Sequence, residues 1–208
     1  MTTMQENKWI EKAGTGENLS SIELEGGQLL TLLEGVSSHA GKDKSLPTLN
    51  AVEVEGGGGA FTARATDRYR LIEGQARALD GSLDKALISL DDIKRIITLA
   101  KEHKSNLVNI TRLGNAITVS SLGDSINLVL REGTFPPTEQ LFTDSEGELS
   151  AIEGVALNPA FMADYAKIAG KGAAIKIYFT GEGKPMRIRI TSDTIIWRAL
   201  LMPMRYKD

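Results

Sequence analysis

The amino-acid sequence predicts an α+β fold in which a unit of one strand, one helix and three strands occurs three times. Short apolar runs of strand-forming residues alternate with a few segments whose apolar residues recur at helical spacing. The 21 glycines among 208 residues are typical of strands that are joined by tight turns. The order of these segments repeats with a period of about 60 residues while the residues themselves differ, which indicates structural repetition.

The first unit follows a polar tail, residues 1–20. Residues 22–24 alternate like a strand, and the apolar residues of 28–39 recur at helical spacing. Three strands are then expected, at 49–55, 60–66 and 69–78. The run Gly56-Gly57-Gly58-Gly59 joins the first two of them. No Lys-Ser or Lys-Thr follows this run, so it indicates a hairpin turn and not a phosphate-binding loop.

The second unit begins with a strand at 85–90 and a helix at 92–103. Ser89 and Asp92 have the spacing of a helix-capping pattern, and the apolar residues of the helix share one face. The remaining elements are three strands at 106–113, 115–122 and 125–131, the closing segment 135–142 and an acidic linker at 144–148.

The third unit has a strand at 151–157 and a helix that begins at Asn158-Pro159, an N-cap followed by a proline suited to the first turn. Its helix reaches about residue 170, and three strands follow at 174–180, 185–191 and 194–201. Pro203 cannot donate to a sheet ladder, so we expect the last strand to end there and the tail to leave the sheet. The predicted domains are therefore 1–20 (tail), 20–142 (two units) and 148–208 (one unit).

Composition and motifs argue for a binding protein. Without cysteine there are no disulfides or thiolate metal sites, no apolar run approaches the roughly 18 residues of a membrane span, and the polar N-terminus does not resemble a signal peptide, so a cytoplasmic location is expected. His39 and His103 stand at helix ends and are interpreted as solvated caps, while Glu53 and Glu55 indicate a wet sheet face. No catalytic, metal or cofactor residues are predicted.

Basic residues cluster on the second and third predicted helices. The cluster consists of Lys94, Arg95, Lys101, Lys104, Lys167 and Lys171. Lys94 and Lys101 lie two turns apart, on a face opposite the isoleucines. With a net charge of −3, any DNA contact must come from such a local concentration, although an ordinary solvated helix face explains the pattern equally well.

Three stretches in chain order resemble the β sliding clamp of bacterial DNA polymerase III. They are Ala65-Thr66-Asp67-Arg68-Tyr69-Arg70-Leu71, the segment from Phe135-Pro136 to Gln140-Leu141, and Met202-Pro203-Met204-Arg205 near the C-terminus. Residues 20–142 resemble the middle domain of that clamp, and residues 150–205 resemble the second half of its final domain. The resemblance implies the DNA clamp fold, with antiparallel sheets outside and helices on the inner face of a ring around duplex DNA.

The resemblance also implies a function without catalysis, namely a processivity factor that tethers a polymerase to DNA. Polymerases and other clients would insert short linear peptides into a hydrophobic groove formed by Leu49, Thr66, Arg68, Tyr69, Arg70, Leu71, Pro136, Gln140, Leu141, Leu200, Met202, Pro203, Met204 and Arg205. The basic helices would meet DNA phosphates without reading sequence. Further implied features are a clamp loader as a partner, a homo-oligomeric state and association with the nucleoid.

The number of units departs from the family. Members carry six units per chain and close a ring with two chains, whereas this sequence predicts three. A ring of the family contains twelve units, which four chains of this kind would supply; alternatively, two chains could pair their odd units. An unpaired third unit would expose some of Phe161, Met162 and Tyr165. The alternative function is a non-encircling, clamp-derived adaptor or decoy that binds the same peptides.

Overall fold

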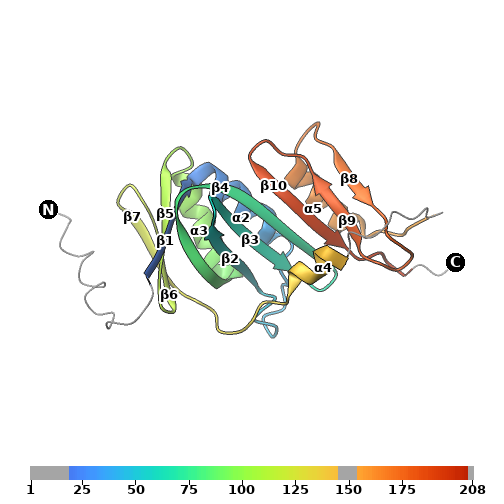
Figure 1. Cartoon of the computed structure of the whole chain (residues 1–208), viewed down its shortest axis with the longest axis horizontal. Helices are drawn as coiled ribbons and strands as arrows, with labels where there is room; N and C mark the ends of the chain where they lie inside the picture. The colour runs from blue at the N-terminus through green and yellow to red at the C-terminus, as the bar shows by residue number, and fades with distance from the viewer. Residues whose placement is uncertain (1–18, 145–153, 206–208) are drawn as a thin grey trace.

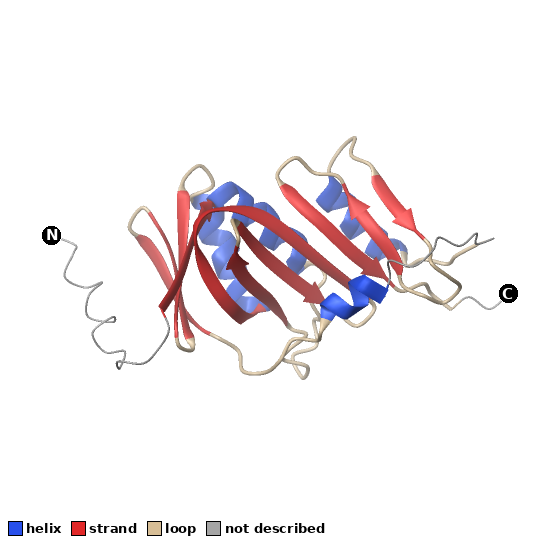
Figure 2. Ribbon diagram, viewed as in Figure 1, coloured by secondary structure: helices blue, strands red, loops and turns tan. Residues whose placement is uncertain are grey.

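The structure, a computed structural model, describes residues 19–144 and 154–205 (Figures 1 and 2). Most of the predicted tail and the first residues of the strand expected at 151–157 therefore lie outside the described ranges. The described part has three helices on one face of an antiparallel sheet, and the short helix α4 lies on the other face (Figure 1). This arrangement confirms the α+β prediction.

The elements follow the predicted order of strands and helices except at β4, at α4 and in the described part of 151–157. They are β1 (Leu19–Glu25), α2 (Gly26–Ser37), β2 (Ala51–Gly57), β3 (Ala60–Thr66), β4 (Arg70–Ser89), α3 (Leu90–Glu102), β5 (Leu107–Leu113), β6 (Ala116–Ser121), β7 (Asp124–Val129), α4 (Thr138–Asp144), α5 (Pro159–Ala169), β8 (Ile175–Tyr178), β9 (Met186–Ile190) and β10 (Ile195–Leu201). The strands are hydrogen-bonded in the order β7-β6-β5-β1-β4-β10-β9-β8, and the β2–β3 hairpin pairs with β4.

Strand β4 corrects one prediction. The segments expected as two strands, 69–78 and 85–90, form one strand of 20 residues. Apart from the buried Leu83, the intervening residues are exposed, but residues 80–82 pair with β1, where Ser21 lies opposite Ser82. Gly81 allows the strand to bend there, because its φ is +85° and a Cβ would lie 2.0 Å from the carbonyl oxygen of Ser21. One strand thus belongs to both of the first two predicted units.

Local signals were predicted correctly. The hydroxyl of Ser89 accepts a hydrogen bond from the Asp92 amide at 3.1 Å, and Asn158 caps α5 through the Ala160 amide at 2.9 Å. The glycine run is a hairpin turn, with Gly58 and Gly59 at positive φ between β2 and β3. Helix α4, by contrast, was not predicted within 135–142.

The third unit packs closely on the first. Strand β10 pairs with β4 from Ile195–Ala76 to Leu201–Arg70, and buried side chains of all three units form one continuous core. Of the apolar residues expected to be exposed on the third helix, Tyr165 is fully buried, while Phe161 and Met162 are half-buried. In the described part of 151–157 there is no strand, only an isolated bridge between Ala156 and Met204.

His39 is also buried, which corrects its interpretation as a solvated cap. Its ring packs against Tyr165 with the ring centroids 4.8 Å apart, so α5 covers the end of α2. Burial, together with the nearby charge of Arg70, lowers the pKa of His39 to about 3. The histidine therefore stays neutral at pH 7 and belongs to the junction between the first and third units.

No described helix is long and apolar enough to span a membrane.

Candidate peptide groove and basic helix face

The base of the candidate groove is a small apolar cluster on the sheet face opposite α2. Leu71 of β4 and Leu200 of β10 are direct cross-strand partners, and both are buried against Phe142 of α4. The alternation of β10 explains this orientation. Trp197 points toward α2, where a Cβ on Gly35 would meet its ring at 2.4 Å, so Leu200 points to the opposite face.

The C-terminal tail runs beside this cluster. Strand β10 ends at Leu201 as predicted, but the tail does not leave the sheet freely. The Met202 amide donates to the Tyr69 carbonyl and the Met204 amide to the Ala156 carbonyl, both at 2.9 Å. The side chains of Met202, Met204 and Arg205 are exposed, whereas Pro203 is half-buried. Both methionines therefore have a fixed backbone and accessible side chains.

The turn that precedes β4 presents Arg68 and Tyr69 to solvent. Asp67 accepts hydrogen bonds from the amides of Tyr69 and Arg70 at 3.1 and 3.0 Å, and Thr66 donates to the Arg70 carbonyl at 2.7 Å. Arg68 has a φ of +79°, which is uncommon for a residue with a side chain. Tyr69 is 58% exposed next to the tail.

Arg70 points toward the helices instead. Its guanidinium contacts Asp164 of α5 at 2.8 Å, Asp67 at 3.0 Å and the Ser38 carbonyl at 2.7 Å, and it lies 4.2 Å above the ring of Phe161. Burial alone would raise the pKa of Asp164, but hydrogen bonds from Arg70 and Lys167 outweigh it and hold that pKa below the usual value. Arg70 thus joins the first and third units, on the face away from Leu71.

The remaining predicted groove residues lie in two loops and in α4. Pro136 is half-buried, while Gln140 is exposed and its amide donates to Asp144 at 3.2 Å. Leu141 is 46% exposed, directly before the buried Phe142. Leu49 is half-buried in the loop after α2, where its carbonyl accepts the Gly41 amide. The turn, the tail and α4 therefore adjoin the Leu71–Leu200 pair, through the Met202–Tyr69 hydrogen bond and the packing of Phe142, and each carries an exposed apolar side chain.

A charged network that sequence reasoning missed holds α4 in place. Glu73, buried on β4, contacts Arg64 at 2.5 Å and Arg198 at 2.6 Å, and Glu139 of α4 contacts Arg198 at 2.5 Å. Burial alone would raise the pKa of Glu73, but hydrogen bonds from Arg198 and the charge of Arg64 lower it. Arg198 also lies 4.1 Å above the ring of Phe142.

The same network changes the interpretation of the two strand glutamates. Glu53 and Glu55 share a face as predicted, but that face is half-buried, and both carboxylates contact Arg64, at 3.3 and 2.6 Å. Alternating charges on neighbouring strands were the available signal, since Arg64 and Glu73 are cross-strand partners.

The basic helix face lies on the other side of the sheet. In α3, Ile93, Ile96 and Ala100 are buried and Lys94, Arg95 and Lys101 are exposed, as the spacing predicts.

Several of these cations are partly neutralised by carboxylates. Lys94 pairs with Asp91 at 2.9 Å, Arg95 with Asp92 at 2.9 Å and Lys167 with Asp164 at 3.1 Å. Hydrogen bonds from Lys94 and Lys44 lower the pKa of Asp91 to about 2. Lys101, Lys104 and Lys171 are exposed, and the described residues form no ion pair with them.

A cavity of about 490 Å³ lies apart from the Leu71–Leu200 pair, between β4, the β5–β6 turn and the segment after β7. Its charged lining includes Lys85, Arg112, Arg131, Glu53 and Glu132. The mixed signs of these charges give the cavity no clear preference for an anion or a cation.

Comparison with known proteins finds similarity to bacterial β sliding clamps, in sequence and in structure. No family model matches the chain. Over 150 residues, which are 70% of this chain and 47% of the relative, it is 30% identical to a beta sliding clamp from Micrococcus luteus. The chain therefore spans about half the length of that curated relative.

Solved structures resemble this chain over most of its length. The beta subunit of DNA polymerase III from Thermotoga maritima superposes with a TM-score of 0.77 at 16% identity, covering 90% of this chain and 66% of that one. A DNA polymerase sliding clamp from Bacillus subtilis gives 0.73 at 17% identity, covering 90% and 64%. At these identities the likeness concerns the fold.

Proposed function

The chain has the DNA clamp fold and is related to the β sliding clamps of bacterial DNA polymerase III, and on this premise we propose that it is a clamp-like processivity factor. It would hold a polymerase on duplex DNA by binding a short linear peptide of the polymerase in the groove around Leu71 and Leu200. It would perform no catalysis of its own. The observation that carries the proposal is the buried cluster of Leu71, Leu200 and Phe142, with exposed apolar residues on the segments that form it.

The groove suits an extended peptide with one or two apolar anchors. The Leu71–Leu200–Phe142 cluster is a rigid base, because two paired strands and the Glu139 ion pairs hold it. Tyr69, Leu141 and Met204 are exposed on the segments that adjoin it and would surround an anchor, and methionine adapts readily to different side chains. The backbone of the peptide would then be fixed by polar groups at the rim.

Peptide binding can be tested with a fluorescent clamp-binding peptide in a polarisation assay. Leu141→Ala should raise the dissociation constant of the peptide about tenfold, since losing an apolar contact of this size costs about 1.4 kcal/mol of binding free energy. Leu107→Ala on β5 is the matched control, because both leucines are 46% exposed. Equal affinities for the two variants would refute the groove.

On the DNA side, we propose that the basic helix face contacts phosphates without reading bases. Lys101 and Lys104 are the best candidates, because Lys94 and Arg95 already pair with aspartates of the same helix. Such contacts tolerate any sequence and leave the protein able to slide.

Salt dependence tests these contacts. Replacing both Lys101 and Lys104 by Glu should weaken duplex DNA binding and lower the slope of log affinity against log salt by about 2, since each phosphate contact contributes about 0.9. Lys184→Glu, in the loop between β8 and β9, is the control. An unchanged slope in the double variant would contradict the assignment of this face to DNA.

The second candidate function is an adaptor or decoy that binds clamp-binding peptides without encircling DNA. The lack of positive charge on α2 favours it, because this helix contains no Lys or Arg. Half of the six basic residues on the other two helices are, in addition, ion-paired. Both functions require the groove. They differ in assembly, since encirclement requires copies to join at the ends of the sheet, β7 and β8, which pair on one side only within the described residues.

Light scattering over a concentration series separates the two functions. A stable tetramer supplies twelve units and supports a ring, and a dimer would form an arc that needs DNA or a partner to close. A monomer that still binds the peptide would favour the adaptor.

A further inference from the structure

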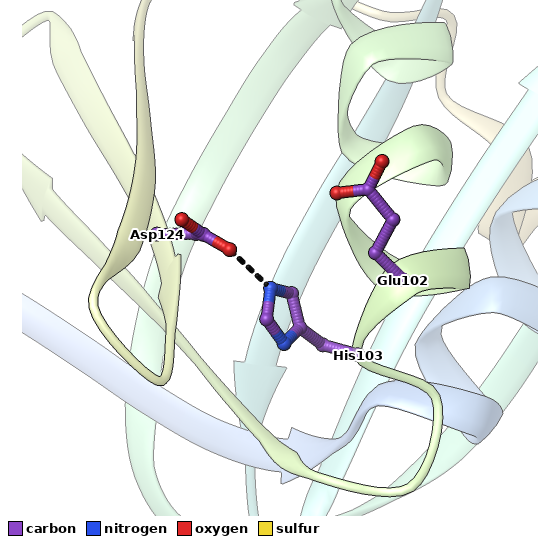
Figure 3. A group of neighbouring side chains, drawn as sticks. All are labelled: Glu102, His103 and Asp124. Atoms are coloured by element: carbon purple, nitrogen blue, oxygen red, sulfur yellow. Dashed lines mark hydrogen bonds and ion pairs between the residues drawn. The ribbon is translucent and has the colours of Figure 1, made fainter.

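Three side chains with metal-binding atoms meet where α3 ends. Glu102 is the last residue of α3, His103 is its C-cap, and Asp124 is the first residue of β7. One ligand atom from each lies within 4.8 Å of the other two. Figure 3 shows the imidazole of His103 directed at Asp124, with Nε2 and Oδ2 2.8 Å apart.

The backbone fixes these groups before any ion binds. The His103 amide donates to the Leu99 carbonyl and the His103 carbonyl accepts from the Asn106 amide, at 3.0 and 2.9 Å. The side chain of His103 is only 12% exposed, which restricts its rotamers. Asp124 follows the turn of Leu122 and Gly123, whose φ values of +45° and +92° are typical of a tight hairpin turn.

The hydrogen bond between His103 and Asp124 explains their contact, but it does not explain the position of Glu102. A helix C-terminus carries partial negative charge, so an acidic residue in the last turn is disfavoured there. Asp124 adds a second carboxylate next to the same helix end. A bound cation would neutralise both carboxylates and the helix end. The flanking Lys101 and Lys104 are exposed and can extend into solvent.

We propose that Glu102, His103 and Asp124 form a Zn²⁺ site that joins the C-terminus of α3 to the hairpin of β6 and β7. One imidazole nitrogen and two carboxylate oxygens suit Zn²⁺, which commonly takes three protein ligands and a water. Mg²⁺ and Ca²⁺ prefer oxygen ligands alone and would gain little from His103.

Binding requires a free lone pair on Nε2 of His103. If the ring is neutral, its proton moves to Nδ1, and if the ring is charged, one proton leaves to solvent. Zn²⁺ then replaces the hydrogen that Nε2 and Asp124 share, while Glu102 turns its carboxylate to the ion. The site uses none of the groove residues, and its ligand Glu102 lies between Lys101 and Lys104, the two lysines proposed to contact DNA phosphates.

Isothermal titration of the full chain, free of any affinity tag and treated with chelator, tests the proposal with Zn²⁺ as the ligand. We expect one Zn²⁺ per chain and an affinity at least tenfold lower for Asp124→Asn. Glu102→Gln should also bind more weakly, and this exposed position leaves the fold intact even if substitution of Asp124 does not. Asp84→Asn, an exposed carboxylate on β4, should bind as the unaltered chain does.

The nitrogen ligand requires a test of its own. With Co²⁺ in place of Zn²⁺, His103→Gln should lose the intense visible absorption of a four-coordinate ion. Fewer than half an equivalent of Zn²⁺ bound, an unchanged affinity in Glu102→Gln and Asp124→Asn, or displacement of Zn²⁺ by an equal concentration of Mg²⁺ would each overturn the site.

Discussion

Acidification should loosen the junction of the first and third units through a single residue, His39. The folded protein holds its pKa at about 3 against a normal value of 6.5, mainly because the ring is buried. Its Nε2 has no hydrogen-bond partner among the described residues, so a charged ring would be buried without compensation. Arg70 opposes protonation further, while the Gly35 carbonyl and Asp164 favour it.

The sign and size of the effect follow from linkage. Above pH 6.5 neither state binds the proton, so the free energy of unfolding is unaffected. Below pH 6.5 only the unfolded chain binds it, and the free energy of unfolding falls by up to about 1.4 kcal/mol per pH unit until the folded pKa near 3 is reached. At pH 5 the loss relative to pH 8 is about 2 kcal/mol.

Urea unfolding of the unaltered chain and of His39→Gln, followed by circular dichroism at pH 8, 6 and 5, measures this effect. The difference between the two proteins should shift by about 2 kcal/mol from pH 8 to pH 5 in favour of the glutamine variant. Carboxylates with lowered pKa values, such as Glu73 and Asp164, lose their stabilising effect only as pH falls below about 4.5, so they contribute little in this window. A difference that stays constant from pH 8 to pH 5 would refute the reasoning.

Three further predictions concern stability and can be checked by the same urea method. Gly81→Ala should cost at least about 2 kcal/mol, because φ is +85° and the new Cβ would meet the Ser21 carbonyl, whereas Gly58→Ala, with open space around it, should cost about 1 kcal/mol. Phe142→Ala should cost about 3 kcal/mol and also weaken peptide binding, since the base of the groove loses one of its three buried side chains. Ser89→Ala should cost about 1 kcal/mol through the lost cap of α3, and an unchanged unfolding midpoint would contradict that role.

The features that could be predicted from the sequence are those decided within a few residues. Ser89, Asn158 and the glycine hairpin have their partners in the same short segment, and the amphipathic pattern of α3 needs only the spacing of its own side chains. The resemblance to sliding clamps also implied that three stretches meet, and the structure brings the first and the last together, Tyr69 with Met202 and Leu71 with Leu200.

The features that could not be predicted depend on distant partners. Residues 79–84 look like a loop, and pairing with β1 and, at Leu83, with β2 makes them part of a strand. Helix α4 is short, and it depends on Arg198, 59 residues away, for its main ion pair. His39 has a polar sequence neighbourhood, and its burial comes from Tyr165. Such contacts between residues far apart in the chain cannot be predicted from local sequence patterns.

Strand β4 has a consequence for how the molecule opens. It is hydrogen-bonded to β1, β2, β3 and β10, so neither half of the described fold can separate without breaking bonds that belong to the other half. Amide hydrogens along β4 should therefore exchange with solvent only through unfolding of the whole described fold, while those of β7 and β8 exchange by local fraying at the sheet ends. The repeated units therefore unfold together and not one by one, and a protease that cuts within β4 would disrupt all three at once.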